Sequence, residues 1–305
     1  MRILVTGADG FLGRGLVAAL SKTYPDAQRI VLTDRAFAAG SPNRMEHVPG
    51  DLGDPDFLDQ LIEPGFDLVF HLASIPGGLA ERDQTLGHQV NLMAPLSLVE
   101  KLAKRQPGAR FVFASSIAVY GHLGRETVTD ATACQPELTY GAHKRMTEIL
   151  LADLARRGVL SAISLRFPGL VARPATESGH GSAFMSQIFH SIAAGEAYTC
   201  PVPAQSTCWW MSKRAAVDNL LHAAGAIEMA QSVIQPPVLH ASVADVANAV
   251  ARLTGQTAKV TFGTDATLQR IFGAMPPLDA RTAISFGFQA DVDLDALVKA
   301  ALSGD

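Results

Sequence analysis

Near its start the sequence reads Arg2-Ile3-Leu4-Val5-Thr6-Gly7-Ala8-Asp9-Gly10-Phe11-Leu12-Gly13, which predicts a strand, a glycine turn and the first turn of a helix. Gly7 permits the tight turn, Gly10 lets the backbone approach a pyrophosphate, and Gly13 lets the helix pack on the strand. An anion is favoured at the helix N-terminus by the amides and the helix dipole. The spacing is GxxGxxG rather than GxGxxG, so three glycines alone remain a weak signal.

A second apolar strand, 30–33, leads directly into Asp34, 21 residues after Gly13. An acidic side chain there accepts hydrogen bonds from the adenosine ribose hydroxyls and repels a 2′-phosphate, which favours NAD over NADP. Arg35 weakens this preference, because an arginine can hold that phosphate. The alternative is that Asp34 is only a turn residue at the end of a strand.

The rest of the first 170 residues alternates strand and helix patterns. Strands are expected near 2–6, 29–33, 67–72, 110–114 and 161–167. Such alternation predicts an α/β fold with a doubly wound parallel sheet, the Rossmann arrangement, in which ligands bind at the carboxyl ends of the strands.

Two fragments carry the candidate chemistry, Ser115-Ser116 and Tyr140-Gly141-Ala142-His143-Lys144. On a helix Tyr140 and Lys144 are four residues apart, so the phenol and the ammonium share one face. A nearby ammonium favours the phenolate and suits the tyrosine to act as a general base. A serine hydroxyl close by could hold the substrate oxygen that the tyrosine deprotonates.

Taken in order, these motifs resemble those of the extended short-chain dehydrogenases/reductases, in the NAD-dependent epimerase/dehydratase group. The resemblance runs from residue 1 to about 241. It is carried by Val5-Thr6-Gly7 with its glycines, Asp34, Asp51-Leu52, His71-Leu72-Ala73, Asn91, Ser115-Ser116, Tyr140 with Lys144, and Leu165-Arg166.

The resemblance implies roles for individual residues. Ser116, which lies four residues before Tyr120, is catalytic together with Tyr140, Lys144 and Asn91. The cofactor is NAD, and the implied NAD-binding residues are Gly7, Gly10, Phe11, Leu12, Gly13, Asp34, Asp51, Leu52, Leu72, Ala73, Asn91, Tyr140, Lys144 and Phe167. The implied substrate-binding residues are Ser74, Ser116, Tyr140 and Arg173.

Asn91 has a local feature of its own. Pro95 follows it by four residues and has no N–H, so it cannot cap the Asn91 carbonyl, and the helix should kink there. The family uses this carbonyl to hold a water connected to the catalytic lysine. A kink with no role is the alternative.

After Phe167-Pro168-Gly169 the pattern changes. Residues 173–211 suggest an irregular lobe rather than a sheet, 212–227 a helix, and Val238-Leu239-His240 a last strand of the main sheet; short helices and one strand, 258–262, follow residue 242. The expected domains are a Rossmann domain of 1–172 and 212–241, and a smaller, discontinuous α/β substrate lobe of 173–211 and 242–305.

The second lobe must select the substrate. Nucleotide-sugar enzymes of the family carry Arg-x-x-Asn-x-x-Gly-Pro, whereas this chain has Gly169 in place of the asparagine and Arg173, not glycine, directly before Pro174. Ile117 replaces the acid that a dehydratase needs after its serine. A plain dehydrogenase is therefore expected, with Arg173 gripping a substrate carboxylate bidentately; a surface arginine is the alternative.

Short segments, including Cys200-Pro201-Val202-Pro203 and Trp209-Trp210-Met211-Ser212, resemble D-erythronate dehydrogenase-like members of the family. These members oxidise a four-carbon sugar acid at C2. The expected activity is NAD-dependent oxidation of such a hydroxy acid. A nucleotide-sugar 4-epimerase, a uronate dehydrogenase and a non-enzymatic cofactor sensor remain as alternatives.

Composition restricts the partners. The net charge is −4 with no basic run, so nucleic-acid binding is not expected, and no apolar run approaches the roughly 20 residues that span a bilayer. Three cysteines without a CxxC pair suggest free thiols in the cytoplasm, and no His/Cys/carboxylate cluster has metal-site spacing. A homodimer, pairing helices near 85–105 and 138–157, is an expectation from the resemblance.

Overall fold

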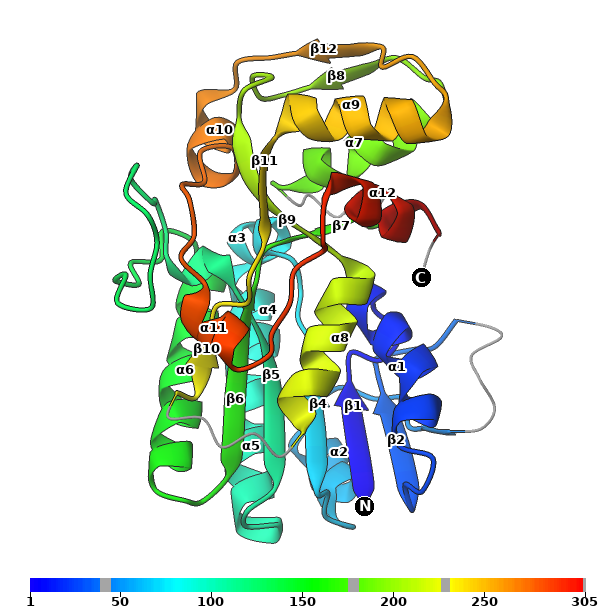
Figure 1. Ribbon diagram of the computed structural model, residues 1–305. Coiled ribbons are helices and arrows are strands. Elements are labelled where there is room, and N and C mark those ends of the chain that lie inside the picture. Colours follow the sequence, from blue (N-terminus) through cyan, green and yellow to red (C-terminus); the bar gives the residue numbers. More distant parts are fainter. Residues whose placement is uncertain (39–44, 175–180, 226–230, 304–305) are drawn as a thin grey trace.

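The computed structural model describes residues 1–38, 45–174, 181–225 and 231–303 of the 305-residue chain. Its larger part is a seven-stranded sheet covered by helices on both faces, and a second lobe lies over one end of this sheet (Figure 1). All neighbouring strands of the seven-stranded sheet pair in parallel, in the order β10-β6-β5-β4-β1-β2-β3. The predicted doubly wound parallel sheet is therefore confirmed.

The strands of this sheet bury both faces. Their bounds are β1 Arg2–Thr6, β2 Arg29–Thr33, β3 Glu46–His47, β4 Leu68–His71, β5 Arg110–Ser116, β6 Ser161–Phe167 and β10 Val233–Ile234. In β1, Ile3 and Val5 join one apolar core while Leu4 joins another on the opposite face. This alternation follows from the strand period of two, and it explains why the strands read as continuous apolar runs.

Two sets of helices cover these faces. Helices α1 (Phe11–Thr23) and α8 (Lys213–Ala224) pack together on one face, and α2 (Pro55–Ile62), α5 (Ala94–Arg105) and α6 (Thr139–Arg156) pack in turn on the other. The start of α2 shows how the sequence fixes a boundary. The Asp54 carboxylate accepts hydrogen bonds from the Asp56 and Phe57 amides, and Pro55 begins the helix.

Between β4 and α5 the chain is helical but irregular. It forms α3 (Gly77–Arg82), α4 (Gln84–His88) and a π-helical turn, η1 (Gln89–Met93). The Ala94 amide donates to the Gln89 carbonyl, five residues back, and Pro95 lies in the first turn of α5. The irregularity predicted between Asn91 and Pro95 is thus a wide turn at which one helix passes into the next.

The second lobe contains more regular structure than the sequence indicated. A three-stranded sheet joins β7 (Gly169–Val171), β9 (Thr207–Ser212) and β11 (Leu239–Ser242), and a two-stranded sheet joins β8 (Tyr198–Cys200) and β12 (Val260–Phe262). The helices of the lobe and its connections are α7 Ala183–Ala193, α9 Val243–Thr254, α10 Ala266–Phe272, α11 Arg281–Ser285 and α12 Leu294–Ser303. The prediction of an irregular segment over 173–211 was wrong, because both α7 and two strands fall within it.

The prediction for Val238-Leu239-His240 was also wrong. Leu239 and His240 pair antiparallel with the two tryptophans of β9, outside the seven-stranded sheet. The edge strand of the main sheet is β10, where Val233 and Ile234 pair with β6. Both indole N–H groups donate to backbone carbonyls. Trp209 Nε1 donates to the Pro276 carbonyl at 2.7 Å, and Trp210 Nε1 donates to the Ala241 carbonyl at 3.0 Å. Both indoles can therefore be buried.

Candidate active site

A cavity of about 360 Å³ opens where the carboxyl ends of the parallel strands face the second lobe. Ten of the residues predicted from the sequence line it: Gly7, Gly10, Phe11, Leu12, Gly13, Leu72, Ser74, Ser116, Tyr140 and Arg173. The predicted glycine turn, proton-transfer groups and arginine therefore share one space, although they come from distant parts of the chain.

The glycine turn is too tight for side chains. Gly7 has φ +68°, and a Cβ on Gly13 would lie 2.1 Å from the Gly7 carbonyl oxygen. Gly10 caps α1 without any side-chain hydrogen bond, and no acidic residue occupies the first turn. The amides at the start of α1 thus face the cavity edge with a positive helix dipole behind them, which suits a pyrophosphate.

The ends of β2 and β3 supply the carboxylates predicted for the adenosine end. Asp34 Oδ2 accepts the Asp9 amide at 3.0 Å, and the Gly50 amide donates to the Asp34 carbonyl at 2.9 Å. This second bond brings Asp51 beside Asp34, and Arg35 lies 3.9 Å from the Asp51 carboxylate. The side chains of Asp34, Arg35 and Asp51 are thus neighbours outside the main cavity.

The end of β4 is tied to both the glycine turn and Asn91. The Leu72 amide donates to the Thr6 carbonyl at 3.1 Å, and a Cβ on Gly7 would lie 2.6 Å from the Ala73 nitrogen. The Asn91 Oδ1 accepts from the Ile75 amide at 2.8 Å and from the Ser74 hydroxyl at 3.0 Å. Asn91 is buried, so its side chain holds the Ser74 segment of the cavity wall in place.

Tyr140 and Lys144 lie on the same face of α6, as predicted. The Lys144 ammonium is 5.5 Å from the centre of the Tyr140 ring and 4.7 Å from that of Phe113, and it donates to the Ala114 carbonyl at 2.8 Å. Burial lowers the pKa of Lys144, while the neighbouring Tyr140 and Glu148 groups oppose this shift. Lys144 therefore lies behind the tyrosine rather than on the cavity surface, where it stabilises a phenolate.

His71 is a further buried titratable group close to Lys144. Its Nδ1 lies 2.8 Å from the Thr6 hydroxyl, and its ring stacks near Phe111 and Phe113. Burial, with a smaller contribution from the Lys144 charge, lowers the pKa of His71 to about 3. His71 is thus neutral near pH 7 and leaves Lys144 as the local positive charge.

Ser116 ends β5 and begins a 3₁₀ turn, η2 (Ile117–Val119), where its hydroxyl accepts the Ala118 amide at 3.2 Å. The turn packs directly against α6. A Cβ on Gly141 would lie 2.2 Å from the Ala118 carbonyl oxygen, so only glycine permits this approach. Gly141 therefore sets how closely Tyr140 and Ser116 can lie, a role that the sequence motif did not reveal.

A buried ion pair fixes α6 to the sheet below the site. Glu148 is fully buried and accepts from the Ser115 hydroxyl at 2.5 Å and from Arg166 at 3.0 and 2.8 Å. Burial opposes the charge of Arg166, but the Glu148 carboxylate raises the pKa of Arg166 above its ordinary value. Because Ser115 precedes Ser116 and Glu148 is one turn from Lys144, the ion pair couples the positions of both candidate catalytic groups.

Arg173 follows β7 and reaches the cavity from the second lobe. Its amide donates to the Ser186 hydroxyl at 3.0 Å, and its carbonyl contacts His190 Nε2 at 2.7 Å, so its backbone is anchored to α7. Burial lowers the pKa of Arg173, and an electrostatic interaction with Tyr140 opposes this shift. The guanidinium thus belongs to the same cavity as the candidate base.

Sequence patterns did not reveal several cavity residues. One wall comes from Ile271, Phe272 and Met275 around the end of α10, and His122 and Glu137 lie on another. Glu137 forms a 2.6 Å ion pair with Arg270 of α10, which joins the two lobes at the cavity. None belongs to a motif, so only the folded chain brings them to the site.

Seven predicted cofactor residues do not line the cavity: Asp34, Asp51, Leu52, Ala73, Asn91, Lys144 and Phe167. Phe167 is packed in the core beneath the sheet end, and Leu52 packs at the edge of the core on the other face. No group of three or more His, Cys, Asp or Glu residues in the described ranges is arranged to hold a metal ion. Nor does any helix within those ranges have the length and apolar character needed to cross a bilayer.

A glycine turn shaped for a pyrophosphate, an acidic residue after β2, and a cavity-lining tyrosine with a lysine behind it define a Rossmann-type dinucleotide enzyme. The chain belongs to the NAD dependent epimerase/dehydratase family, whose sequence model matches residues 3–211. NAD is therefore its cofactor, and the resemblance inferred from the motifs is confirmed.

Two relatives are similar over nearly the whole chain. The D-erythronate dehydrogenase of Cupriavidus necator is 35% identical over 318 residues, covering 98% of this chain and 97% of its own. That of Haemophilus influenzae is 29% identical and covers 100% of both. Among solved structures, a nucleoside-diphosphate-sugar epimerase from Agrobacterium tumefaciens has a TM-score of 0.88 at 27% identity, covering 100% of this chain and 95% of that one.

Proposed function

We propose that the protein catalyses the NAD-dependent oxidation of a hydroxyl group of a small sugar acid, of the D-erythronate kind, at C2. The observation that carries this proposal is that Tyr140 and Arg173 line one cavity. A base and a guanidinium in one space suit a substrate with a hydroxyl beside a carboxylate. The two D-erythronate dehydrogenases that are similar over full length support the same substrate class.

In this mechanism Tyr140 accepts the proton of the reacting hydroxyl. The Ser116 hydroxyl holds the same substrate oxygen, and the Lys144 ammonium stabilises the phenolate that must be present beforehand. When bound, NAD⁺ supplies the acceptor for the hydride that leaves the carbinol carbon. Asn91 is a positioning residue, since its side chain fixes the Ser74 segment of the cavity that Tyr140 also lines.

Arg173 is the proposed carboxylate ligand. A planar guanidinium can bind both carboxylate oxygens, which fixes the orientation of the carbinol carbon relative to the base. Its backbone contacts with Ser186 and His190 place it on the second lobe. We propose the division expected from the sequence, with substrate binding by 173–211 and 242–305 and NAD binding by 1–172 and 212–241, except that Leu239–Ser242 pairs within the second lobe.

The first experiment is a panel of aldonic and uronic acids with NAD and NADP, followed by absorbance of the reduced cofactor. Net reduction with a four-carbon aldonic acid is expected. A response confined to uronic acids would indicate a uronate dehydrogenase instead. Retained NAD without net reduction, together with interconversion of nucleotide sugars, would indicate a 4-epimerase and overturn the proposal.

The second experiment tests Arg173 with two variants. A charge-assisted contact contributes about 1.5–3 kcal/mol, so Arg173→Ala should lower kcat/KM for the acid by roughly 10- to 150-fold. Arg173→Lys should restore little of it, because an ammonium lacks the bidentate geometry. NAD affinity and the low activity on the matching neutral polyol should not change. If acid and neutral substrate decline together, Arg173 has a structural role and the carboxylate site lies elsewhere.

We also propose that the protein is a cytoplasmic homodimer. Cys134, Cys200 and Cys208 form no disulfide, which suits a reducing compartment.

Met93 of η1 and Met146 and Ile149 of α6 are large apolar side chains that are 44–55% exposed. Helices α5 and α6 pack together, so a partner docked across them would cover these side chains. Light scattering coupled to size-exclusion chromatography should give a mass near 65 kDa, about twice the 32.3 kDa of one chain, and Ile149→Glu should lower it to one chain.

A further inference from the structure

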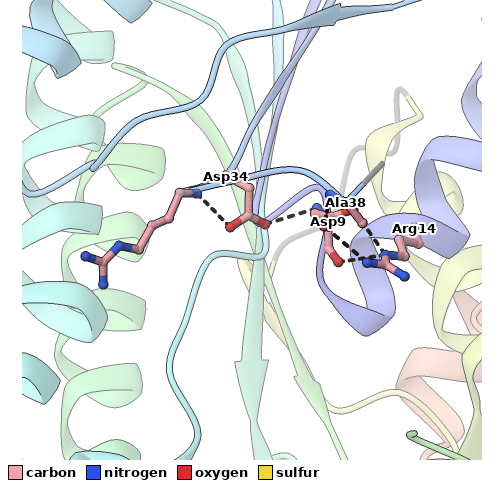
Figure 2. A network of polar contacts seen from close by, with 5 residues as sticks. Asp9, Arg14, Asp34 and Ala38 are labelled. Carbon is pink, nitrogen blue, oxygen red and sulfur yellow. Dashed lines mark hydrogen bonds and ion pairs between the residues drawn. The ribbon is translucent and has the colours of Figure 1, made fainter. Parts of the chain in front are cut away.

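Asp9 is an acidic residue inside the glycine turn, between Gly7 and Gly10. Figure 2 shows its carboxylate between two partners: the Ala38 amide donates to Oδ2 at 3.0 Å, and Arg14 of α1 donates to both oxygens at 3.1 Å. Asp9 thus links the glycine turn, the first helix and the chain that follows β2. In this fold the glycine turn and the start of the first helix hold the pyrophosphate, and the residue at the end of β2 binds the neighbouring adenosine ribose.

A second carboxylate, that of Asp34, lies beside it. The Asp9 amide donates to Asp34 Oδ2 at 3.0 Å (Figure 2), and the Arg35 amide donates to Asp34 Oδ1 at 2.8 Å. Burial raises the pKa of Asp9, but the hydrogen bonds from Arg14 and Ala38 and the Arg14 charge hold it below the ordinary value of 3.8. Asp9 is therefore ionised at neutral pH.

Arg14 is a cation that could otherwise attract a phosphate to this edge. Its side chain is 60% exposed, but two of its nitrogens are engaged by the Asp9 carboxylate. On the other side Arg35 is 71% exposed, and its ion pair with Asp51 is long, at 3.9 Å. Arg14 and Arg35 thus lie near the predicted adenosine site, and Asp9 neutralises Arg14. The carboxylates of Asp9 and Asp34 supply negative charge beside them.

We propose that Asp9 is a second determinant of cofactor choice, which together with Asp34 excludes the 2′-phosphate of NADP by adding negative charge and by keeping Arg14 paired. The inference rests on NAD as the cofactor and not on the identity of the acid substrate. Without the Asp9 charge, Arg14 and Arg35 would face the adenosine edge with only one carboxylate between them. Asp34, at the end of β2, therefore accounts for only part of the selectivity for NAD over NADP.

The test compares two fragments of the cofactor, adenosine 2′,5′-bisphosphate and 5′-AMP, by isothermal titration calorimetry. Their ratio of dissociation constants isolates the 2′-phosphate and needs no substrate, so it stands even if the proposed acid is wrong. Asp9→Asn keeps the size and the acceptor for Ala38 but removes the charge. We expect this ratio to move about tenfold in favour of the bisphosphate, with 5′-AMP affinity changed less than threefold, and the gain to shrink at high salt.

Arg14→Met is the matched partner variant. If Asp9 acts by charge, losing Arg14 leaves the carboxylate uncompensated, so the ratio should move at least twofold against the bisphosphate, opposite to Asp9→Asn. If the pair only ties the turn to α1, both variants should shift the ratio in the same direction or not at all. That result overturns the proposal. Thermal unfolding of each variant verifies that the measured protein is folded.

Discussion

The buried pair Glu148–Arg166 offers the strictest test of how the site is held. Replacing Glu148 by Ala leaves the Arg166 guanidinium, only 9% exposed, without its carboxylate and removes the acceptor of the Ser115 hydroxyl. An uncompensated buried charge of this kind costs about 3–5 kcal/mol. A 305-residue chain has an entropy of unfolding of about 0.6 kcal/mol/K, so the midpoint of thermal unfolding should fall by about 5–8 °C.

Activity should respond as well, because Glu148 lies one turn from Lys144 and Ser115 adjoins Ser116. We expect kcat to fall more than the affinity for NAD, which depends mainly on the glycine turn. Arg145→Met is the control: Arg145 is 36% exposed and also contacts Glu148, at 3.1 Å, and its loss should cost under about 1 kcal/mol. The double variant Glu148→Leu/Arg166→Met should recover stability relative to Glu148→Ala, since no buried charge remains.

These outcomes are measured by calorimetry and by urea unfolding followed through circular dichroism. A Glu148→Ala variant destabilised by less than about 1 kcal/mol would refute the assignment of a strong buried network. So would a double variant no more stable than the single one. In either case the geometry of α6 would have to depend on apolar packing alone.

Three further predictions concern the residues around the base. Tyr140→Phe should lower kcat at least about 100-fold with unchanged thermal stability, as stopped-flow and calorimetry would show, and substantial residual turnover would exclude Tyr140 as the base. Gly141→Ala should push α6 away from the Ala118 carbonyl and lower kcat and the unfolding midpoint together, whereas Ala142→Gly, the adjacent control, should only lower stability by about 1 kcal/mol. His71 has its pKa lowered from 6.5 to about 3 in the fold, so between these values the unfolded chain binds a proton that the folded chain does not. Stability should therefore fall by up to about 1.4 kcal/mol per pH unit as pH drops below 6.5, and His71→Asn should flatten that slope in acid titrations; an unchanged slope would mean that other groups cause it.

The parallel sheet could be predicted because its central strands are continuous apolar runs. Each run leads into a residue of a recognisable cofactor-binding or catalytic motif. Gly7, Asp34 and Ser116 each follow such a run. The two short strands could not be predicted. Glu46–His47 has no apolar character, and Val233–Ile234 is two residues long, so their pairing depends on neighbours that only the fold supplies. The same reason explains Leu239 and His240, whose partner strand was itself unrecognised.

In the site, residues that act through backbone shape or a fixed spacing were visible in the sequence. Tyr140 with Lys144 and the three glycines are of this kind. Glu148 was not visible, because a glutamate in a helix usually faces solvent, and only the folded chain shows Arg166 and Ser115 around it. The wall formed by Phe272 and Met275 has no signal either, since apolar residues of this type are equally suited to any core.

The candidate proton-transfer groups and the cavity wall of the second lobe are supported by different parts of the structure. The proton-transfer groups stand on β5 and α6, which the Glu148–Arg166 pair fixes to the sheet. Met185 and Phe272, which line the cavity, pack with a separate core of the second lobe. Changes in that lobe can therefore reshape the substrate cavity while the base and its lysine keep their geometry. A family that shares one proton-transfer apparatus can in this way act on unlike substrates, so for this chain the choice of acid must be sought in the second lobe, beginning with Arg173.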